Sequence, residues 1–276
     1  MSEEDEIHDL IEVDVLDDEP PCDDEDDDNS TTWGTEIEDN ISLANENEEV
    51  IDMSISSFKA HRDSVYCAAV HPKNPLLIVT GGGDDNGFLW SYSMNESDEN
   101  NSNFGSKIDK CNILAGHKDS VISVGFNFDG SLLFTASLDG TIIIWKVDTI
   151  EQVGILEGPE DIEWAEWHPK GNALIAGSSD GTIWMWLAGT GQCLQVFAGH
   201  DGKVSCGLFT RDGKLIVSGG DDGTVRVWNP KTGVCKHTYE GHFAHEGTVT
   251  CIASSLDGDL IATGRIIFNT YFKAII

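Results

Sequence analysis

Short runs of alternating apolar and polar residues recur along the chain from about residue 55, and Asp-Gly pairs separate them. In one copy, an alternating run at 121–126 is followed by Asp-Gly at 129–130, an apolar run at 132–136, a second Asp-Gly at 139–140 and a run that ends at Trp145. Asp-Gly between such runs predicts tight hairpin turns, because both residues accept positive φ. The pattern predicts an all-β fold in which each unit of ~40 residues has about four short antiparallel strands.

The units share a fixed spacing of three residue types. Four tryptophans each follow an aspartate by six residues: Trp90, Trp145, Trp186 and Trp228 follow Asp84, Asp139, Asp180 and Asp222. Three of these tryptophans also follow a histidine by 28 or 29 residues, namely His61, His117 and His200. The polar stretch from Asn95 to Lys110 lengthens the first interval, and we expect it to form a long surface loop.

This pattern resembles the WD repeat, in which Gly-His is followed by a turn aspartate and then by a tryptophan that closes a strand. Gly116-His117, Asp139 and Trp145 match it in one unit. The resemblance covers residues 55–264 and implies a β-propeller, in which each repeat forms one four-stranded blade. We expect repeats at about 55–93, 111–147, 153–188 and 194–230, and a partial one at 239–264.

The resemblance also implies a structural hydrogen-bond network in each blade, built from the histidine, a Ser/Thr four residues before the aspartate, the aspartate and the tryptophan. The expected sets are His61-Thr80-Asp84-Trp90, His117-Thr135-Asp139-Trp145 and His200-Ser218-Asp222-Trp228. The third repeat keeps Asp180 and Trp186 but has Ala176 and Gly158 in place of the hydroxyl and the histidine. Both partners are missing together, which avoids a half-satisfied buried network. A catalytic reading is disfavoured, because an active site would not be copied three times in register.

A fifth repeat begins at His245 and has Thr263 in register. Its turn aspartate is expected at position 267 and its tryptophan at 273, where the chain has Ile267 and Lys273. We therefore expect an incomplete propeller of four blades and a partial fifth, followed by a non-repeat tail at 265–276. Our hypothesis for this tail is a translated intron or an alternative 3′ end. Unpaired sheet flanks would then make the product unstable or let it associate through its ends.

Charge divides the chain into two parts. The formal net charge is −33, and residues 1–52 hold 23 Asp/Glu and no Lys or Arg. We expect disorder at 1–54, because this acidic leader repels itself and cannot form a core. It could act as a solubilising tail or as a lure for a basic partner. Such acidity disfavours direct binding to nucleic acid and to anionic membranes.

The start of the chain lacks the basic, apolar pattern of a signal peptide, and no apolar run approaches the ~18 residues of a membrane span. The seven cysteines include no CxxC pair, so we expect reduced thiols in the cytoplasm, with the nucleus as an alternative. Cys67, Cys206 and Cys251 occupy equivalent first-strand positions, typical of small core residues. We expect no metal site and no cofactor.

Each repeat carries an acid one or two residues past the histidine position: Asp63, Asp119, Glu160, Asp201 and Glu246. By family resemblance, the loops that hold these acids line one propeller face. A ring of carboxylates would suit a segment rich in Arg and Lys, although such acids are also common in WD repeats generally. Trp164, Trp167 and Trp184 could form an aromatic ligand patch or pack within and beneath the blade.

The third repeat reads Asp161-Ile-Glu-Trp-Ala-Glu-Trp167 and then Gly181-Thr-Ile-Trp-Met-Trp186. Together with the Gly-rich segment 81–86, it resembles the angio-associated migratory cell protein family. That family implies an acidic leader joined to a propeller, and it includes a fungal branch that chaperones a basic large-subunit ribosomal protein. We therefore expect a non-catalytic scaffold that binds a basic protein segment. The alternatives are a signalling or cell-migration scaffold and a ubiquitin-ligase substrate receptor.

Overall fold

The computed structural model describes residues 57–94, 106–240, 245, 247–255, 260–265 and 272–275. The acidic leader predicted at 1–54 lies outside these ranges. The regular secondary structure of the described residues consists of β-strands, as the hydrophobic pattern predicts. No helix in these ranges is long and apolar enough to cross a membrane.

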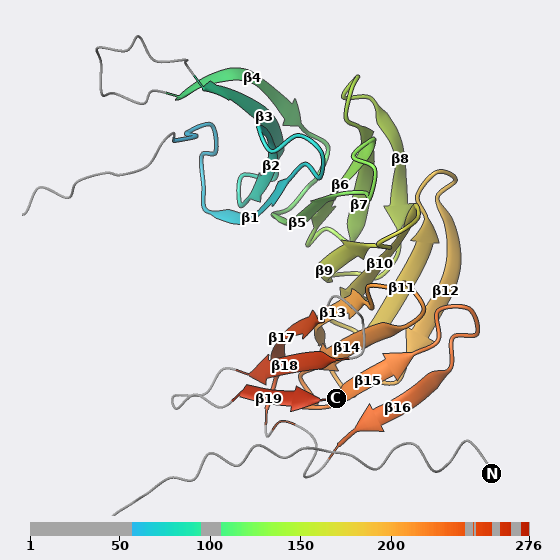
Figure 1. The fold of residues 1–276 in the computed structure, drawn as a ribbon. Helices are drawn as coiled ribbons and strands as arrows, with labels where there is room; N and C mark the ends of the chain where they lie inside the picture. Colours follow the sequence, from blue (N-terminus) through green and yellow to red (C-terminus); the bar gives the residue numbers. More distant parts are fainter. Residues whose placement is uncertain are drawn as a thin grey trace, which may run out of the picture. The chain divides into compact units, whose positions relative to one another are not determined.

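Within these ranges, nineteen strands form five antiparallel sheets in chain order (Figure 1). The first sheet holds β1 (Val65–Val70), β2 (Leu77–Gly82), β3 (Gly87–Met94) and β4 (Ser106–Leu114). The second holds β5 (Val121–Phe126), β6 (Leu132–Ser137), β7 (Thr141–Lys146) and β8 (Gln152–Glu157). The third holds β9 (Ile162–Trp167), β10 (Ala173–Ser178), β11 (Thr182–Leu187) and β12 (Gln192–Ala198). The fourth holds β13 (Val204–Phe209), β14 (Ile216–Gly220), β15 (Val225–Trp228) and β16 (Cys235–Tyr239). The fifth holds β17 (Val249–Ser254), β18 (Ile261–Arg265) and β19 (Phe272–Ile275).

Successive sheets lie next to one another through their first strands. β1 contacts β5, β5 contacts β9, β9 contacts β13, and β13 contacts β17. Four-stranded antiparallel sheets that repeat in this order are propeller blades. The all-β propeller prediction is therefore confirmed.

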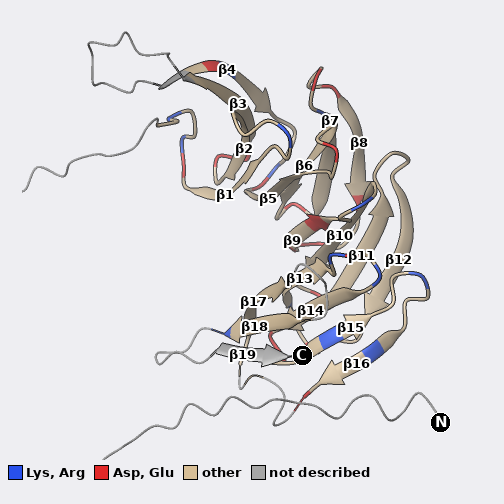
Figure 2. Cartoon of the chain, in the orientation of Figure 1, with Lys and Arg blue, Asp and Glu red and all other residues tan. Residues whose placement is uncertain are grey.

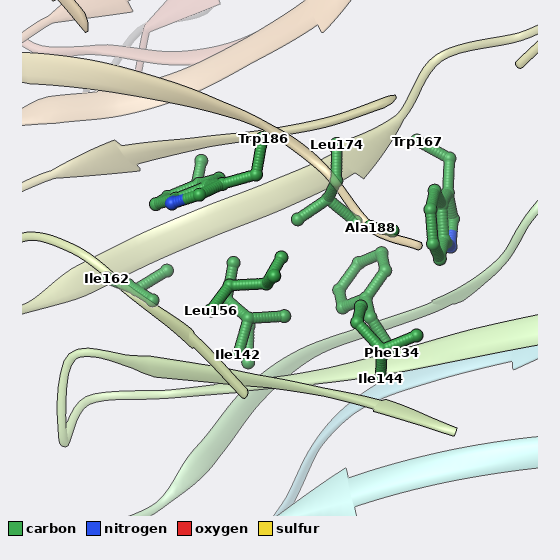
Figure 3. Packing of buried hydrophobic residues seen from close by; sticks show 11 residues of the cluster. Phe134, Ile142, Ile144, Leu156, Ile162, Trp167, Leu174, Trp186 and Ala188 are labelled. Atoms are coloured by element: carbon green, nitrogen blue, oxygen red, sulfur yellow. The ribbon is translucent and has the colours of Figure 1, made fainter. Parts of the chain in front are cut away.

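The hydrophobic core lies between neighbouring sheets rather than inside any one of them. Phe134 and Ile142 of the second sheet pack against Trp167, Leu174 and Trp186 of the third, as Figure 3 shows. Similar clusters join the first sheet to the second, the third to the fourth and the fourth to the fifth. The middle strands are almost completely buried, because both of their faces meet a neighbouring sheet. Each blade is therefore stabilised by its neighbours.

The turn between the second and third strands of a sheet also packs against the next sheet. Gly140 has a φ of 79°, a conformation that favours glycine. A Cβ at Gly140 would overlap the backbone carbonyls of Pro159 and Glu160, which precede β9. The Asp-Gly turns therefore place the loop before each first strand as well as closing a hairpin.

The stretch from Asn95 to Lys110 is not the continuous loop that its polar composition predicts. β3 runs on past Trp90 to Met94 and pairs with β4, whose ladder begins at Ser106 opposite Met94. Ser93 Oγ donates to Asp109 Oδ1 at 3.0 Å across this pair. This bond satisfies two polar side chains across the strand pair, so their polarity does not prevent the ladder from extending here.

Part of the predicted non-repeat tail adds a strand to the fifth sheet. β19 pairs with β18, with Ile275 opposite Ile261. In the second sheet the corresponding position, opposite Leu133, is held by Trp145. The register therefore assigns the tryptophan position to Ile275 and not to Lys273, which lies opposite Thr263.

Candidate partner-binding site

A chain of three hydrogen bonds runs through the second sheet. Trp145 Nε1 donates to Thr135 Oγ1 at 3.1 Å, and Thr135 Oγ1 lies 2.8 Å from His117 Nε2. His117 Nδ1 lies 3.4 Å from Asp139 Oδ2. We assign the Nδ1–H tautomer, because Nε2 then accepts the threonine proton and Nδ1 donates to the carboxylate. Every member is thereby satisfied in a buried setting.

The fourth sheet repeats this arrangement with serine in place of threonine. Trp228 Nε1 donates to Ser218 Oγ at 2.8 Å, His200 Nε2 lies 2.8 Å from the same oxygen, and His200 Nδ1 lies 3.1 Å from Asp222. Burial lowers the pKa of His200 and outweighs the opposing effect of Asp222. Both ring nitrogens are occupied and the imidazole is held neutral, so this group is a structural element and not a free base.

The first sheet completes only part of the network. His61 Nδ1 lies 2.9 Å from Asp84 Oδ1, and His61 Nε2 lies 2.9 Å from Thr80 Oγ1. The structure does not join Trp90 to this pair, which corrects the expectation for this residue: its buried Nε1 has no partner among the described residues. The Trp90 ring instead stacks on Phe58, with centroids 4.7 Å apart and planes 4° apart. The stacking contact with Phe58 thus substitutes for the missing hydrogen bond in fixing the Trp90 ring.

The third sheet replaces the network with aromatic packing. A Cβ at Gly158 would lie 2.6 Å from Cζ2 of Trp186, so this ring fills the space that a side chain there would need. Trp186 Nε1 donates to the carbonyl of Glu157 at 3.2 Å, and Trp184 stacks on Trp186 with centroids 5.9 Å apart. Asp180 accepts hydrogen bonds from Thr182 instead of from a histidine. Asp180 and Trp186 therefore take part in separate hydrogen bonds rather than in one network.

In the fifth sheet, His245 Nε2 lies 2.8 Å from Thr263 Oγ1. Glu246, the acid predicted for this repeat, lies outside the described residues, as do the residues from Ile266 to Tyr271.

The networks fix the loops that precede the first strands. The backbone amides of Arg62, Lys118 and Asp201 donate to the turn aspartates of their own sheets at 2.8 to 3.0 Å. In the second sheet, hydrogen bonds from Thr141 and from the Lys118 amide overcome burial and hold the pKa of Asp139 below its usual value. The turn aspartates of the first, second and fourth sheets therefore anchor the loops that carry Asp63, Asp119 and Asp201.

We call Asp63, Asp119, Glu160 and Asp201 the acidic face; all four are exposed. The Asp63 carboxylate accepts from the Ser64 amide at 2.6 Å, and Asp119 accepts from the Ser120 amide at 2.7 Å. Asp201 differs from them. It occupies the position that Arg62 and Lys118 hold in the first two sheets, and its backbone amide donates to the turn aspartate. The acids therefore occupy two different positions in the loops, and Arg62 and Lys118 directly precede Asp63 and Asp119 in the chain. Figure 2 shows residues of both charges on the segments that join the strands.

The spacing of the repeat does not point to two further acids, Glu163 in β9 and Asp85 in the turn between β2 and β3. Glu163, the second residue of β9, pairs with Lys203 before β13 at 2.6 Å. Asp85 contributes to the charge around His117 of the next sheet. Both belong to contacts between neighbouring sheets, which the spacing inside one repeat does not reveal. The pairing leaves Glu163 less available to a partner than Glu160.

The tryptophans of the third repeat pack between blades. Trp164 Nε1 donates to the Val204 carbonyl at 3.0 Å, and Trp167 Nε1 donates to the Gly125 carbonyl at 3.0 Å. β9 is thus tied to β13 on one side and to β5 on the other. These contacts favour the packing interpretation over an exposed aromatic patch.

Cys67 and Cys206 lie in first strands and direct their sulfurs toward backbone carbonyls of the next sheet. Burial raises the pKa of both thiols to about 12, so they are inert. In the described part of the chain, no three His, Cys, Asp or Glu side chains gather as metal ligands would.

Comparison with known proteins identifies the repeat. Five stretches match the family model of the WD domain, G-beta repeat: residues 53–91, 109–146, 150–186, 191–229 and 233–265. The chain belongs to the WD-repeat family. WD-repeat proteins are generally non-catalytic scaffolds for protein interaction, and this chain is built from such repeats.

Named relatives refine the comparison. The chain is 37% identical over 215 residues to the angio-associated migratory cell protein of Homo sapiens, a match that covers 78% of this chain and 46% of the human protein. It is 28% identical over 199 residues to the ribosome assembly protein SQT1 of Saccharomyces cerevisiae, covering 65% of this chain and 42% of the yeast protein. It is 32% identical over 161 residues to the F-box-like/WD repeat-containing protein TBL1X of Homo sapiens, a match that covers 55% of this chain and 26% of TBL1X. The first similarity confirms the resemblance drawn from the third repeat. The chain spans less than half the length of each of these three relatives.

Proposed function

We propose that this WD-repeat scaffold captures a basic segment of a partner protein on its acidic face. The observation that supports this best is the anchoring of the loops that carry Asp63 and Asp119. Backbone amides beside these acids donate to the turn aspartates, so the carboxylates are exposed on loops of fixed conformation. Preorganised charges lose little side-chain freedom on binding and attract an oppositely charged segment over a long range.

The proposed function involves no reaction at the His-Ser/Thr-Asp sets. Thr135 and Ser218 are fully buried, and each hydroxyl is shared between an indole N–H and a histidine. A nucleophile must reach a substrate, and these oxygens face packed side chains. The sets therefore serve the binding loops.

We propose a large-subunit ribosomal protein as the partner, with the chain acting as its escort in the cytoplasm and nucleus. Similarity to a relative named a ribosome assembly protein supports this choice. The second candidate is a signalling or cell-migration scaffold or a ubiquitin-ligase substrate receptor. It draws support from the names of the human angio-associated migratory cell protein and of TBL1X.

A pull-down with paired charge-reversal variants tests the proposal. The test variant combines Asp119→Lys with Glu160→Lys on the acidic face. The control variant combines Asp148→Lys with Glu151→Lys in the turn between β7 and β8, at the opposite ends of the strands. Both change the net charge equally, so a difference between them reports position and not total charge.

We expect the unaltered chain and the control to retain basic ribosomal proteins at low salt and to release them at high salt. The acidic-face variant is expected to retain no basic ribosomal proteins at either salt concentration. Salt-resistant partners, or equal loss in the two variants, would contradict the proposal and favour the second candidate.

A further inference from the structure

A cavity of about 630 Å³ opens where the first strands β5, β9 and β13 end, and β17 also contributes to its wall. Its wall is rich in aromatic side chains, among them Phe126, Phe128 and Phe209. The acidic face lies at the beginning of the same strands. Across the six residues of β9, a rise of about 3.3 Å per residue separates the two ends by about 17 Å. The cavity and the acidic face are therefore separate sites.

Glu166 is the one carboxylate among the described residues that line this cavity. It departs from the repeat: the equivalent first-strand positions hold Ala69, Gly125, Leu208 and Ala253, as the strand registers show. Small or aliphatic residues satisfy the fold at this level of the other four sheets. The blade architecture therefore gives no reason for an acid here.

The surroundings of Glu166 leave its charge poorly compensated. Burial raises the pKa of this carboxyl to about 7, while the Phe209 amide and the more distant Arg211 act in the opposite direction. Arg211 is exposed, and no basic side chain lies within ion-pair distance of Glu166 in the described part of the chain. A carboxylate in an apolar wall is stabilised by a cation that comes into direct contact with it.

The other lining elements add no competing acid. Besides Glu166, the titratable groups that line the wall are Arg211 and His168. The His168 ring is held by the Gly213 carbonyl at 3.2 Å and the Lys170 amide at 3.2 Å. The lining residues of β5 and β17 carry no titratable side chain. Cation recognition in this cavity therefore depends on Glu166.

We propose that this cavity is a second binding site, which takes one lysine or arginine side chain of a partner protein. The cationic head lies at Glu166, and the aliphatic stem packs against Phe126, Phe128 and Phe209. Aromatic walls suit this ligand, because they bury the stem and attract the cation through their ring faces. An anionic group would be repelled by Glu166, and a purely apolar group would leave the carboxylate without a partner. The site does not rest on the acidic face, so either proposal stands if the other fails.

Two probes test the site by NMR with ¹³C-labelled glutamate: n-butylammonium, and a glycine peptide that carries a single lysine. Both are expected to lower the apparent pKa of Glu166, and both bind about tenfold more tightly at about pH 8 than at about pH 6, because the ionised fraction of Glu166 changes by that factor. Glu166→Gln removes this pH dependence. Glu163→Gln, at the other end of β9, is the matched control and keeps it.

Each contrary result overturns the assignment. Binding of neutral 1-pentanol as tightly as of n-butylammonium would show an apolar site without cation recognition. Unchanged binding in a folded Glu166→Gln variant would remove Glu166 from the site, and the far-UV circular dichroism spectrum checks that this variant folds. Binding of n-butylammonium without binding of the peptide would assign the cavity to free amines rather than to a protein partner. Binding of neither probe would refute the site.

Discussion

Trp164 on β9 donates its indole N–H to the backbone carbonyl of Val204 on β13, at 3.0 Å. The bond joins the third sheet to the fourth. The Trp164 ring also lies against Gly207, where a Cβ would overlap it. The tryptophan and the glycine are therefore complementary parts of one contact between neighbouring blades.

A double-mutant cycle tests this contact. Trp164→Leu is expected to lower the free energy of unfolding by about 2–3 kcal/mol, through the lost ring contacts and the unpaired carbonyl. Gly207→Ala is destabilising while the ring is present. In the double variant the smaller leucine side chain leaves room for the new methyl, so the combined loss is less than the sum of the two single losses by at least ~0.5 kcal/mol in urea unfolding. Simple additivity would show that the two residues do not share this contact.

Ser218 carries the network of the fourth sheet, since it bonds both Trp228 and His200. Ser218→Ala is expected to lower the free energy of unfolding by about 2–3 kcal/mol, because it leaves two buried polar groups without partners. Ser179→Ala removes a hydroxyl that bonds Asp161 in an exposed turn and is the matched control. We expect it to change stability by no more than about 0.5 kcal/mol. Equal effects of the two substitutions in urea unfolding would contradict the network.

The same network gives a defined pH dependence. The pKa of His200 is lowered in the folded protein by burial, so the unfolded chain binds the proton more readily. Stability therefore falls as the pH drops below the unfolded value of about 6.5. His200→Gln is expected to flatten the unfolding free energy between about pH 6.5 and about pH 5. His237→Gln, at an exposed position, is the control and should leave the curve unchanged.

Glu166 has the opposite effect to His200 on how the stability of the protein depends on pH. Its folded-state pKa of about 7 exceeds the usual carboxyl value of 4.5, so the folded protein holds the proton more tightly than the unfolded chain. Stability therefore decreases as the pH rises from about 4.5 to about 7. Because the cavity opens to solvent, we expect Glu166→Gln to remove a loss of about 2 kcal/mol over this window. Parallel curves for the variant and the unaltered protein would contradict burial of the carboxylate.

Spacing within one repeat predicts the fold, because hairpin turns and strand alternation are local. The Asp-Gly pairs mark the turns, and Trp145, Trp186 and Trp228 mark the ends of the third strands in the second, third and fourth sheets. The prediction is wrong for residues 106–110, where β4 pairs with the extended β3. Local polarity indicated a loop there, and the contribution of a partner strand cannot be read from polarity alone.

Contacts between blades were harder to predict. The missing hydroxyl and histidine at Ala176 and Gly158 were visible in the sequence, but their replacement by the stacked rings of Trp184 and Trp186 was not. Glu166 passed unnoticed for a related reason. A single acid in a first strand carries no motif, and its place in an aromatic cavity depends on residues of three other sheets. Comparing equivalent positions across the five first strands would have revealed it.

Mapping where a basic peptide binds tests the central claim most directly. A peptide rich in lysine and arginine, carrying a photoreactive group, is cross-linked to the chain at low salt, and the attachment sites are found by mass spectrometry. Our account predicts cross-links to the loops that hold Asp63, Asp119 and Glu160, and their loss in the Asp119→Lys/Glu160→Lys variant. Cross-links concentrated at the turn between β7 and β8, or unchanged in that variant, would contradict it.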